Sequence, residues 1–375
     1  ASQRMLRQLG PSTAIDYAFV TDGAYSALLV TSDGRLAFQF PITITELEGR
    51  VVSLRRVLQN PSADPIRPAQ DLYRILIPEG LRKELDRRGI RHIMWSLDGG
   101  LRYVPMGALH DGEQYLASRY GHSVYGPASG ERLTAAVPRK WTGIGFGATN
   151  GGIGYGVLPA VTEELEGIFG AKAGDQPVQG RVLLNKQFTR KSLLEHACEC
   201  NLVHIASHFA SRPGGPENSK LLLGDGSEIS LAELDAVPGL FNGVDLVTLS
   251  ACQTALGNQT GDGLEIDSLA SAMQRLGANA VLASLWSVND QSTALFMQEF
   301  YKVRQANAGM TKAEALQQAQ LGMLEGKVRG KGCGAQRMGS EQKEAGTAPG
   351  YLCDGERPYA HPYYWAPFVL MGNWK

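Results

Sequence analysis

Nearly continuous apolar segments alternate with predicted helices through the carboxyl-terminal part of the chain, and this alternation limits the possible folds most. The apolar segments include LVHIAS (202–207), DLVTLSA (245–251) and AVLASLW (280–286). The predicted helices around them cover residues 189–200, 264–276 and 291–305. Strands that are apolar along their whole length are buried on both faces, so the pattern predicts an α/β fold with a mainly parallel sheet flanked by helices.

The first 138 residues have a different pattern and form a separate predicted part. Short apolar runs separated by turn residues predict strands in a meander. Thr45 and Glu48 fit a capping box at the start of a helix, and a second helix is expected over residues 70–88. Because the composition changes near residue 139, we expect a boundary between 1–138 and 139–375.

Two glycine-rich segments interrupt the second part. Gly143, Gly145 and Ala148 fit a dinucleotide-binding fingerprint loosely, but further glycines follow where the fingerprint needs the start of a helix. We therefore reject a dinucleotide site and expect a mobile glycine-rich loop. Residues 326–362 are rich in Gly, Lys, Glu and Gln, which predicts an exposed insertion loop, part of it disordered.

Composition and charge exclude several classes of function. The 36 Lys and Arg residues nearly balance the 37 Asp and Glu residues, so nothing favours contact with nucleic acid or with a membrane. No stretch is apolar enough to span a membrane, and the first residues lack the apolar core of a secretory signal, so we expect a cytoplasmic protein. Because the chain begins with Ala1 instead of Met, we expect it to be part of a longer protein.

The five cysteines are few and odd in number, which favours reduced thiols over a disulfide scaffold. Cys198 and Cys200 have no second pair at the spacing that a zinc site requires. The sequence therefore predicts no metal site and no cofactor.

Two predicted strands end in reactive side chains, His208 after the first and Cys252 after the second. If these strands are parallel neighbours, both side chains leave the sheet at the same edge. An imidazole that takes the thiol proton creates a thiolate and later protonates the leaving amine, and the backbone N–H of Cys252 is placed to bind the oxyanion. The alternative is that Cys252 is an inert core residue, and His204 is expected to have a structural role.

Four segments resemble the CHAT-domain proteins, which are caspase-like peptidases often found behind tetratricopeptide repeats and related to separase. The segments are HIASHF, LVTLSACQTALG, GLEIDSLASAMQRLGANAVLASLWSVND and HPYYWAPFVLMGNW, in this order along the chain. The resemblance implies a caspase-like fold in which residues 1–138 form a degenerate pseudo-peptidase half and residues 139–375 form the catalytic half. It also implies that His208 and Cys252 are the catalytic pair.

The resemblance further suggests which residues bind substrate. Phe209 stands where the wider caspase-like clan usually has Gly, so its ring is expected to narrow the cleft or fill a substrate pocket. In the resembling fold, the loop from Trp286 to Asp290 borders the pocket for the residue before the scissile bond. Asp290 at the pocket floor would favour Lys or Arg; the alternative is that it caps the following helix. Asp262 and Glu265 are second candidates for lining the cleft.

The function that the sequence predicts is hydrolysis of peptide bonds in a protein substrate by a cysteine endopeptidase, through a thioester. The resemblance implies that an upstream sensor region of tetratricopeptide repeats or an activating partner controls the activity, as in bacterial defence systems. One alternative is a non-catalytic scaffold or interaction module with the same fold. Another is a cysteine hydrolase that acts on small molecules.

Overall fold

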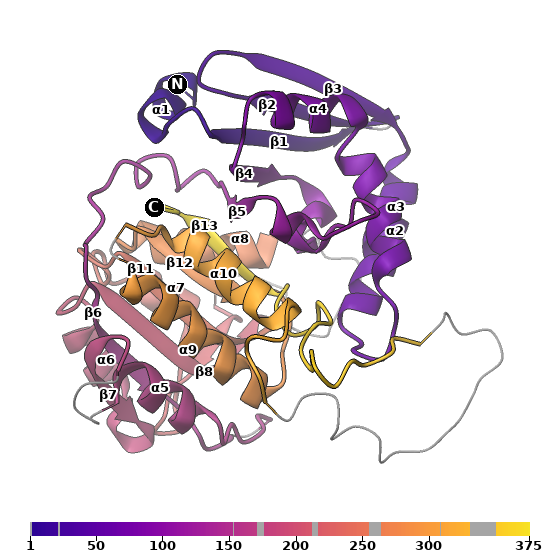
Figure 1. Cartoon of the computed structure of the whole chain (residues 1–375). Helices are drawn as coiled ribbons and strands as arrows, with labels where there is room; N and C mark the ends of the chain where they lie inside the picture. Colours follow the sequence, from indigo (N-terminus) through magenta and orange to yellow (C-terminus); the bar gives the residue numbers. More distant parts are fainter. Residues whose placement is uncertain are drawn as a thin grey trace. The chain divides into compact units, whose positions relative to one another are not determined.

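The structure, a computed structural model, describes residues 2–21, 23–152, 154–170, 176–211, 217–254, 264–307, 309–330 and 350–375; the side chains of residues 211, 251–254 and 264–268 lie outside this description. The chain divides into two compact units (Figure 1). The first unit holds the described residues of Ala1–Tyr125 and Gln320–Ala366, and the second holds those of Gly126–Gln259, Leu264–Ala319 and Pro367–Lys375. The boundary expected near residue 139 stays a prediction.

The strands of the first unit run in the order β5-β4-β1-β2-β3. The first three strands form the antiparallel meander that their turn residues predicted, and β4 and β5 continue the sheet in parallel. The strands are β1 (Thr13–Thr21), β2 (Ala24–Val30), β3 (Arg35–Pro41), β4 (His92–Leu97) and β5 (Gly121–Val124). The helices are α1 (Ser2–Leu9), α2 (Ile44–Leu58), α3 (Ile66–Leu76) and α4 (Glu79–Arg87), with short 3₁₀ turns η1 (Gly99–Tyr103), η2 (Met106–Ala108) and η3 (Leu116–Ser118).

The capping box of α2 lies two residues earlier than the sequence predicted. Thr43 has the extended backbone of an N-cap residue, and its hydroxyl accepts the N–H of Glu46. The carboxylate of Glu46 accepts the N–H of Thr43 in return. The prediction of Thr45 and Glu48 was wrong because both pairs have the same spacing, and only the backbone conformation distinguishes them.

The single helix expected over residues 70–88 is also wrong, because α3 ends at Leu76 and α4 begins at Glu79. Pro78 lies between them. Proline has no backbone N–H, and its ring clashes with the preceding helical turn, so an uninterrupted helix through this position is unfavourable.

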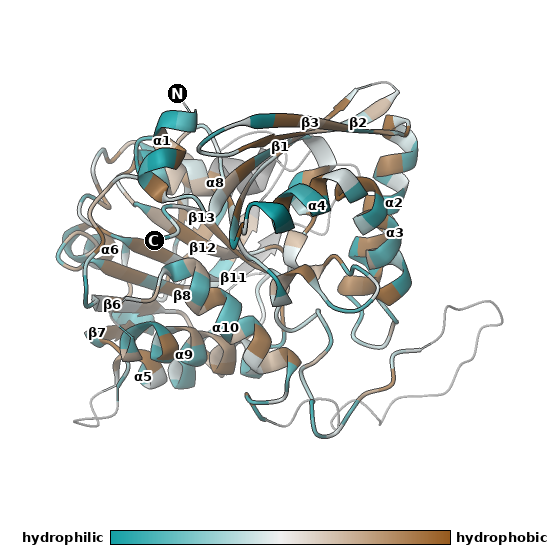
Figure 2. Cartoon of the chain, turned by 45° about the horizontal axis from the view of Figure 1, so that its top comes forward, coloured by the Kyte–Doolittle hydropathy of each residue, from teal (hydrophilic) through white to brown (hydrophobic). Residues whose placement is uncertain are grey.

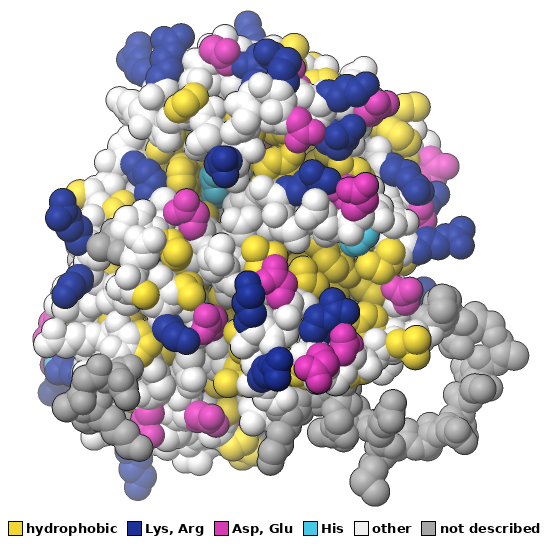
Figure 3. All heavy atoms as spheres, viewed as in Figure 1, with side chains coloured by type: hydrophobic (Ala, Val, Ile, Leu, Met, Phe, Trp, Pro, Cys, Tyr) yellow, Lys and Arg dark blue, Asp and Glu magenta, His cyan; other side chains and the backbone are white. Residues whose placement is uncertain are grey.

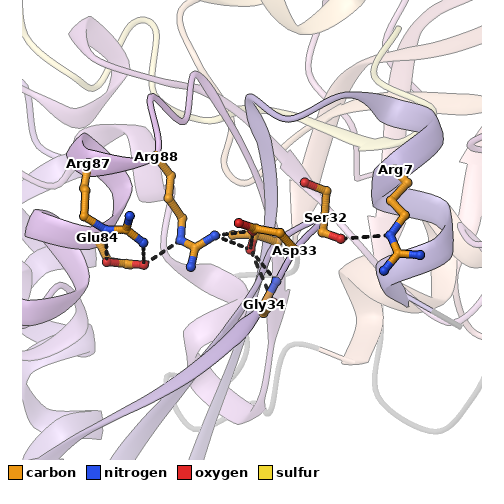
Figure 4. Close-up of polar contacts among 8 residues, drawn as sticks. Arg7, Ser32, Asp33, Gly34, Glu84, Arg87 and Arg88 are labelled. Atoms are coloured by element: carbon orange, nitrogen blue, oxygen red, sulfur yellow. Dashed lines mark hydrogen bonds and ion pairs between the residues drawn. The ribbon is translucent and has the colours of Figure 1, made fainter.

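Arg88, which follows α4, joins that helix to the turn between β2 and β3 (Figure 4). Its guanidinium donates to Glu84 Oε1 at 2.5 Å and to Thr31 Oγ1 at 3.0 Å, and it pairs with Asp33. Arg87 binds only Glu84 among the residues drawn in Figure 4. The basic end of α4 is thus engaged in ion pairs inside its own unit.

The second unit contains a mainly parallel sheet in the order β7-β6-β8-β11-β12-β13. Strand β13 is antiparallel to β12, and the β9–β10 hairpin extends the end of β8. The strands are β6 (Thr142–Gly147), β7 (Gln179–Leu184), β8 (Leu202–Ser211), β9 (Lys220–Leu222), β10 (Glu228–Ser230), β11 (Leu246–Thr254), β12 (Ala280–Ser284) and β13 (Phe368–Gly372). This confirms the predicted fold class.

Helices flank this sheet. Helices α5 and α9 pack against each other, and α8 packs against β11 and β12. The helices are α5 (Val161–Phe169), α6 (Arg190–His196), α7 (Leu231–Asp235), α8 (Leu264–Arg275) and α9 (Asp290–Ala306), with the 3₁₀ turn η4 (Asn185–Gln187); α10 (Lys312–Leu324) contains residues of both units. Figure 2 shows the strands β11 and β12 mostly in the hydrophobic colour, as expected for strands covered on both faces.

The distribution of charge on the surface agrees with the small net charge of the chain. Charged side chains of both signs are interspersed on the face drawn in Figure 3. None of the described helices is long and apolar enough to cross a membrane.

The structure corrects one expectation about the cysteines. Cys198 and Cys200 are free thiols, as predicted, but Cys353 is disulfide-bonded. An odd number of cysteines excludes complete pairing but not a single bond, so the inference of reduced thiols throughout was too broad.

The predicted insertion loop, residues 326–362, lies partly outside the described residues. Its last residues pack within the first unit: Tyr359 and His361 are buried, and His361 Nε2 donates to the carbonyl of Ala63 at 2.9 Å. Tyr351 N donates to the carbonyl of Ser62 at 2.9 Å. This end of the segment is therefore part of the folded unit.

Candidate functional site

The two strands that end in His208 and Cys252 are parallel neighbours. Strand β11 pairs with β8 over nearly its whole length, from Leu246 opposite Leu202 to Thr254 opposite Ser211. Cys252 lies opposite Phe209, the residue after His208. The backbone of Cys252 is therefore next to that of His208 at the carboxyl ends of both strands.

A β-bulge interrupts the pairing between Ser250 and Cys252, beside these residues. Ser250 is opposite Ala206 and Cys252 is opposite Phe209, so one residue of β11 faces two residues of β8, Ser207 and His208. A bulge breaks the alternation of side chains and re-aims the residue that it contains, and bulges are common beside active sites. The local backbone thus gives His208 a direction that strict alternation would not.

The imidazole of His208 has a defined hydrogen-bond partner. Its Nε2 lies 2.8 Å from the carbonyl oxygen of Gly156, in the glycine-rich loop that follows β6. A carbonyl only accepts, so Nε2 carries the proton and Nδ1 of the neutral ring keeps its lone pair. The side chain is 4% exposed. In the neutral ring, Nδ1 is therefore the nitrogen with an available lone pair.

We define the glycine-rich loop as residues 149–152 and 154–158. Both the N–H and the hydroxyl of Thr149 donate to Asn185 Oδ1, at 2.9 and 3.0 Å. A Cβ on Gly151 would lie 2.2 Å from the carbonyl oxygen of Tyr155, so the loop can fold back on itself only with glycine there. The ring of Tyr155 stacks on His208. Tyr155 and Gly156 were not among the site residues predicted from the sequence, although an aromatic residue inside a glycine-rich loop was a usable signal.

A network of buried, hydrogen-bonded side chains joins the same two strands to two helices. Glu164 on α5 contacts His204 Nε2 at 2.7 Å, and His204 Nδ1 lies 3.0 Å from the hydroxyl of Tyr301 on α9. That hydroxyl also bonds Thr248 on β11 at 2.7 Å. The structural role expected for His204 is thus a link between two helices and both strands.

Asp290 does not cap α9. Asn289 is the N-cap residue, and its side chain accepts the N–H of Ser292. Asp290 Oδ2 instead accepts the N–H of Ala160 at 2.6 Å. Burial raises the pKa of the Asp290 carboxyl above its ordinary value, and nearby His208 acts in the opposite direction. The carboxylate is therefore in the electrostatic neighbourhood of His208, and its place in a substrate pocket stays a prediction.

The other residues predicted to bind substrate have different positions. Phe209 and Trp286 are both buried, each about 5% exposed. Asp262 lies outside the described residues, and Glu265 is the second residue of α8, with a side chain that is not described. Their part in a cleft stays a prediction. Among the described residues, no group of three or more His, Cys, Asp or Glu side chains could hold a metal ion.

Comparison with known proteins supports the fold. Two structures of the separase–securin complex from Saccharomyces cerevisiae match with TM-scores of 0.58 and 0.56, at 10% and 11% sequence identity. The matches cover 99% of this chain but only 30% and 31% of the matched chains, so the chain spans less than a third of their length. A complex of the pro- and mature domains of RgpB from Porphyromonas gingivalis also matches, at 10% identity and a TM-score of 0.45, over 88% of this chain and 76% of that one.

A search of curated protein sequences gave no significant match. The CHAT-domain family model, however, matches residues 66–373, which is most of the chain. The family match and the similarity in fold to separase agree with the mainly parallel α/β sheet described above. The chain belongs to the CHAT-domain family.

Proposed function

We propose that this protein is a cysteine endopeptidase in which Cys252 is the nucleophile and His208 is the general base. The observation that carries the proposal is the register of β8 and β11, which sets the backbone of Cys252 opposite Phe209, directly beside His208. The bond from His208 Nε2 to Gly156 supports it, because this bond leaves Nδ1 free to accept a proton.

The proposed reaction begins when Nδ1 of His208 takes the proton of the Cys252 thiol. The thiolate attacks the carbonyl carbon of the scissile peptide bond, and the backbone N–H of Cys252 binds the oxyanion. The imidazolium returns the proton to the amine as the C–N bond breaks, which leaves a thioester. Water, deprotonated by His208, then hydrolyses the thioester and restores the thiol.

We also propose that the activity is gated by an upstream sensor region or by an activating partner, in a cytoplasmic protein that acts in bacterial defence. The near-complete burial of His208 supports gating, because a protein substrate must reach the imidazole. The glycine-rich loop contacts His208 directly through Tyr155 and Gly156. A shift of this loop is therefore the simplest way to open the site.

The experiment that tests the proposal labels the protein with peptide electrophiles and locates the label by mass spectrometry. Cys198 is an exposed free thiol and serves as an internal reference for ordinary reactivity. Cys252 should react faster than Cys198 in the wild-type protein, and His208→Ala should abolish the difference. Because a gated site can be closed in the isolated chain, the labelling is repeated with the upstream region restored. Labelling of Cys252 that is no faster than that of Cys198, and is indifferent to His208→Ala in both forms, would reject the peptidase and favour the scaffold alternative.

A further inference from the structure

The ring of Tyr155 lies over the imidazole of His208. The ring centroids are 5.2 Å apart and the planes differ by 29°, which is a stacked arrangement. The phenol hydroxyl of Tyr155 donates to Glu228 Oε1 on β10 at 2.9 Å. Tyr155 therefore contacts the candidate base with its face and a neighbouring strand with its polar end.

A single hydrogen bond does not determine the orientation of an imidazole. The bond from His208 Nε2 to Gly156 directs one ring nitrogen, but a single bond at one atom does not by itself fix the plane of the ring. A flat partner against the ring face removes this freedom, because turning would open a gap or create a clash. The direction of Nδ1 then becomes fixed, which is what proton transfer from a neighbouring thiol requires.

We propose that Tyr155 is a positioning residue for His208, held in place by Glu228. This inference rests on the proposed function, because it assigns a role relative to the general base. Tyr155 acts through His208 and takes no part in proton transfer.

The contacts around Tyr155 lead back to His208 through neighbouring elements of the second unit. Phe209, directly after His208, pairs with Leu221 of β9, and β9 continues into the β9–β10 hairpin that carries Glu228. Glu228 in turn binds the hydroxyl of Tyr155, whose ring lies on His208. These contacts therefore connect the glycine-rich loop to the β9–β10 hairpin, and both to the strand that carries His208.

The charged groups near Tyr155 do not supply the same contact with His208 as the stacked ring does. Lys220 Nζ donates to Glu228 Oε2 at 2.9 Å, so the anchor carboxylate is already paired with a cation. His208 acts to lower the pKa of Asp290, against the raising effect of burial, and an oxygen of Asp290 accepts the N–H of Ala160. The feature specific to Tyr155 is therefore its aromatic face.

The test compares variants in the labelling assay for Cys252, resolved into a maximum rate and a half-saturating concentration of the peptide electrophile. Tyr155→Leu removes the flat face and should lower the maximum rate about tenfold. The half-saturating concentration should change by less than about twofold. Tyr155→Phe keeps the face and should restore at least half of the wild-type rate. Val157→Ala, at a 71% exposed site of the same loop, is the matched control and should have no effect.

Each result has a distinct meaning. If His208→Ala slows labelling but Tyr155→Leu does not, the positioning role is wrong and the proposed function stands. If Tyr155→Leu and Tyr155→Phe lose the same rate, the stacked face is not the determinant and the inference is again wrong. If His208→Ala has no effect on labelling of Cys252 even with the upstream region restored, the proposed function itself fails. Thermal unfolding of each variant separates loss of folding from loss of positioning, since Tyr155 is only half-buried.

Discussion

His204 on β8 and Thr248 on β11 lie directly opposite each other in neighbouring parallel strands, and the hydroxyl of Tyr301 bonds both side chains. Each lies four residues before a residue of the proposed catalytic pair, His208 and Cys252. The bridge therefore links the two strands just ahead of the bulge that directs His208. Removal of the bridge should affect both the stability of the sheet and the geometry at its edge.

Tyr301→Phe should lower the free energy of unfolding by about 1–3 kcal/mol, because two buried polar side chains lose a hydrogen-bond partner. Urea denaturation measures this loss. Tyr17→Phe is the control, since the Tyr17 hydroxyl bonds Ser2 in a partly exposed position and should cost less. Tyr301→Phe should also slow the labelling of Cys252, whereas Tyr17→Phe should not. Equal losses for the two variants would contradict a special role for the bridge.

Asp290→Asn should reduce the preference for peptide electrophiles with Arg or Lys over Leu by about tenfold, if Asp290 is at the pocket floor. Asparagine can still accept the N–H of Ala160, so the variant removes the charge while keeping the local bond. The measurement is the ratio of labelling rates with matched peptides. Asn289→Ala removes the helix cap next to it and should cost about 1 kcal/mol of stability without changing the ratio. An unchanged ratio in Asp290→Asn would show that Asp290 is not at the floor of the substrate pocket.

Asp16 on β1 should make the stability of the protein depend on pH. The side chain is 1% exposed, neither carboxylate oxygen is hydrogen-bonded to a described group, and burial raises its pKa from 3.8 to about 7. Between these values the unfolded state loses the proton and the folded state keeps it. Stability should therefore fall as pH rises from about 4 to about 7, by at most about 1.4 kcal/mol per pH unit, and level off above.

The comparison of Asp16→Asn with the wild-type protein isolates this effect, because asparagine does not titrate. Urea denaturation at several pH values should show that the variant gains stability relative to wild type as pH rises towards 7. Parallel curves for the two proteins would mean that Asp16 keeps an ordinary pKa in the folded state.

Arg88 and Arg87 form a matched pair for testing the contacts in Figure 4. The Arg88 side chain is 16% exposed and reaches Thr31 and Asp33, whereas that of Arg87 is 64% exposed and binds the adjacent Glu84. Exposed ion pairs contribute little to stability. Arg88→Ala should therefore lower the thermal unfolding midpoint by several degrees and Arg87→Ala hardly at all. The reverse order would show that the link to the β2–β3 turn is unimportant.

Local patterns in the sequence were sufficient to predict the two strands that carry the proposed catalytic pair. Apolar runs such as LVHIAS and DLVTLSA predicted buried parallel strands, and the structure confirms β8 and β11 as neighbours. The positions of His208 and Cys252 after these runs follow from the same pattern. Such features depend on residues close together in the chain, so hydrophobic periodicity records them. Even locally, Thr43 and Thr45 fitted the same capping pattern, and only the folded backbone distinguished them.

The sequence by itself determined the alternation of strands and helices and therefore the strand ends at which His208 and Cys252 lie. The tertiary structure alone decided that these strands are neighbours and which groups contact His208. The bulge at His208 arises from pairing with a strand more than forty residues away, and the carbonyl that binds its Nε2 belongs to Gly156, 52 residues earlier. Tyr301 reaches His204 across 97 residues. No local periodicity encodes such partners, because they depend on how separate elements pack and on which polar groups burial leaves to be paired.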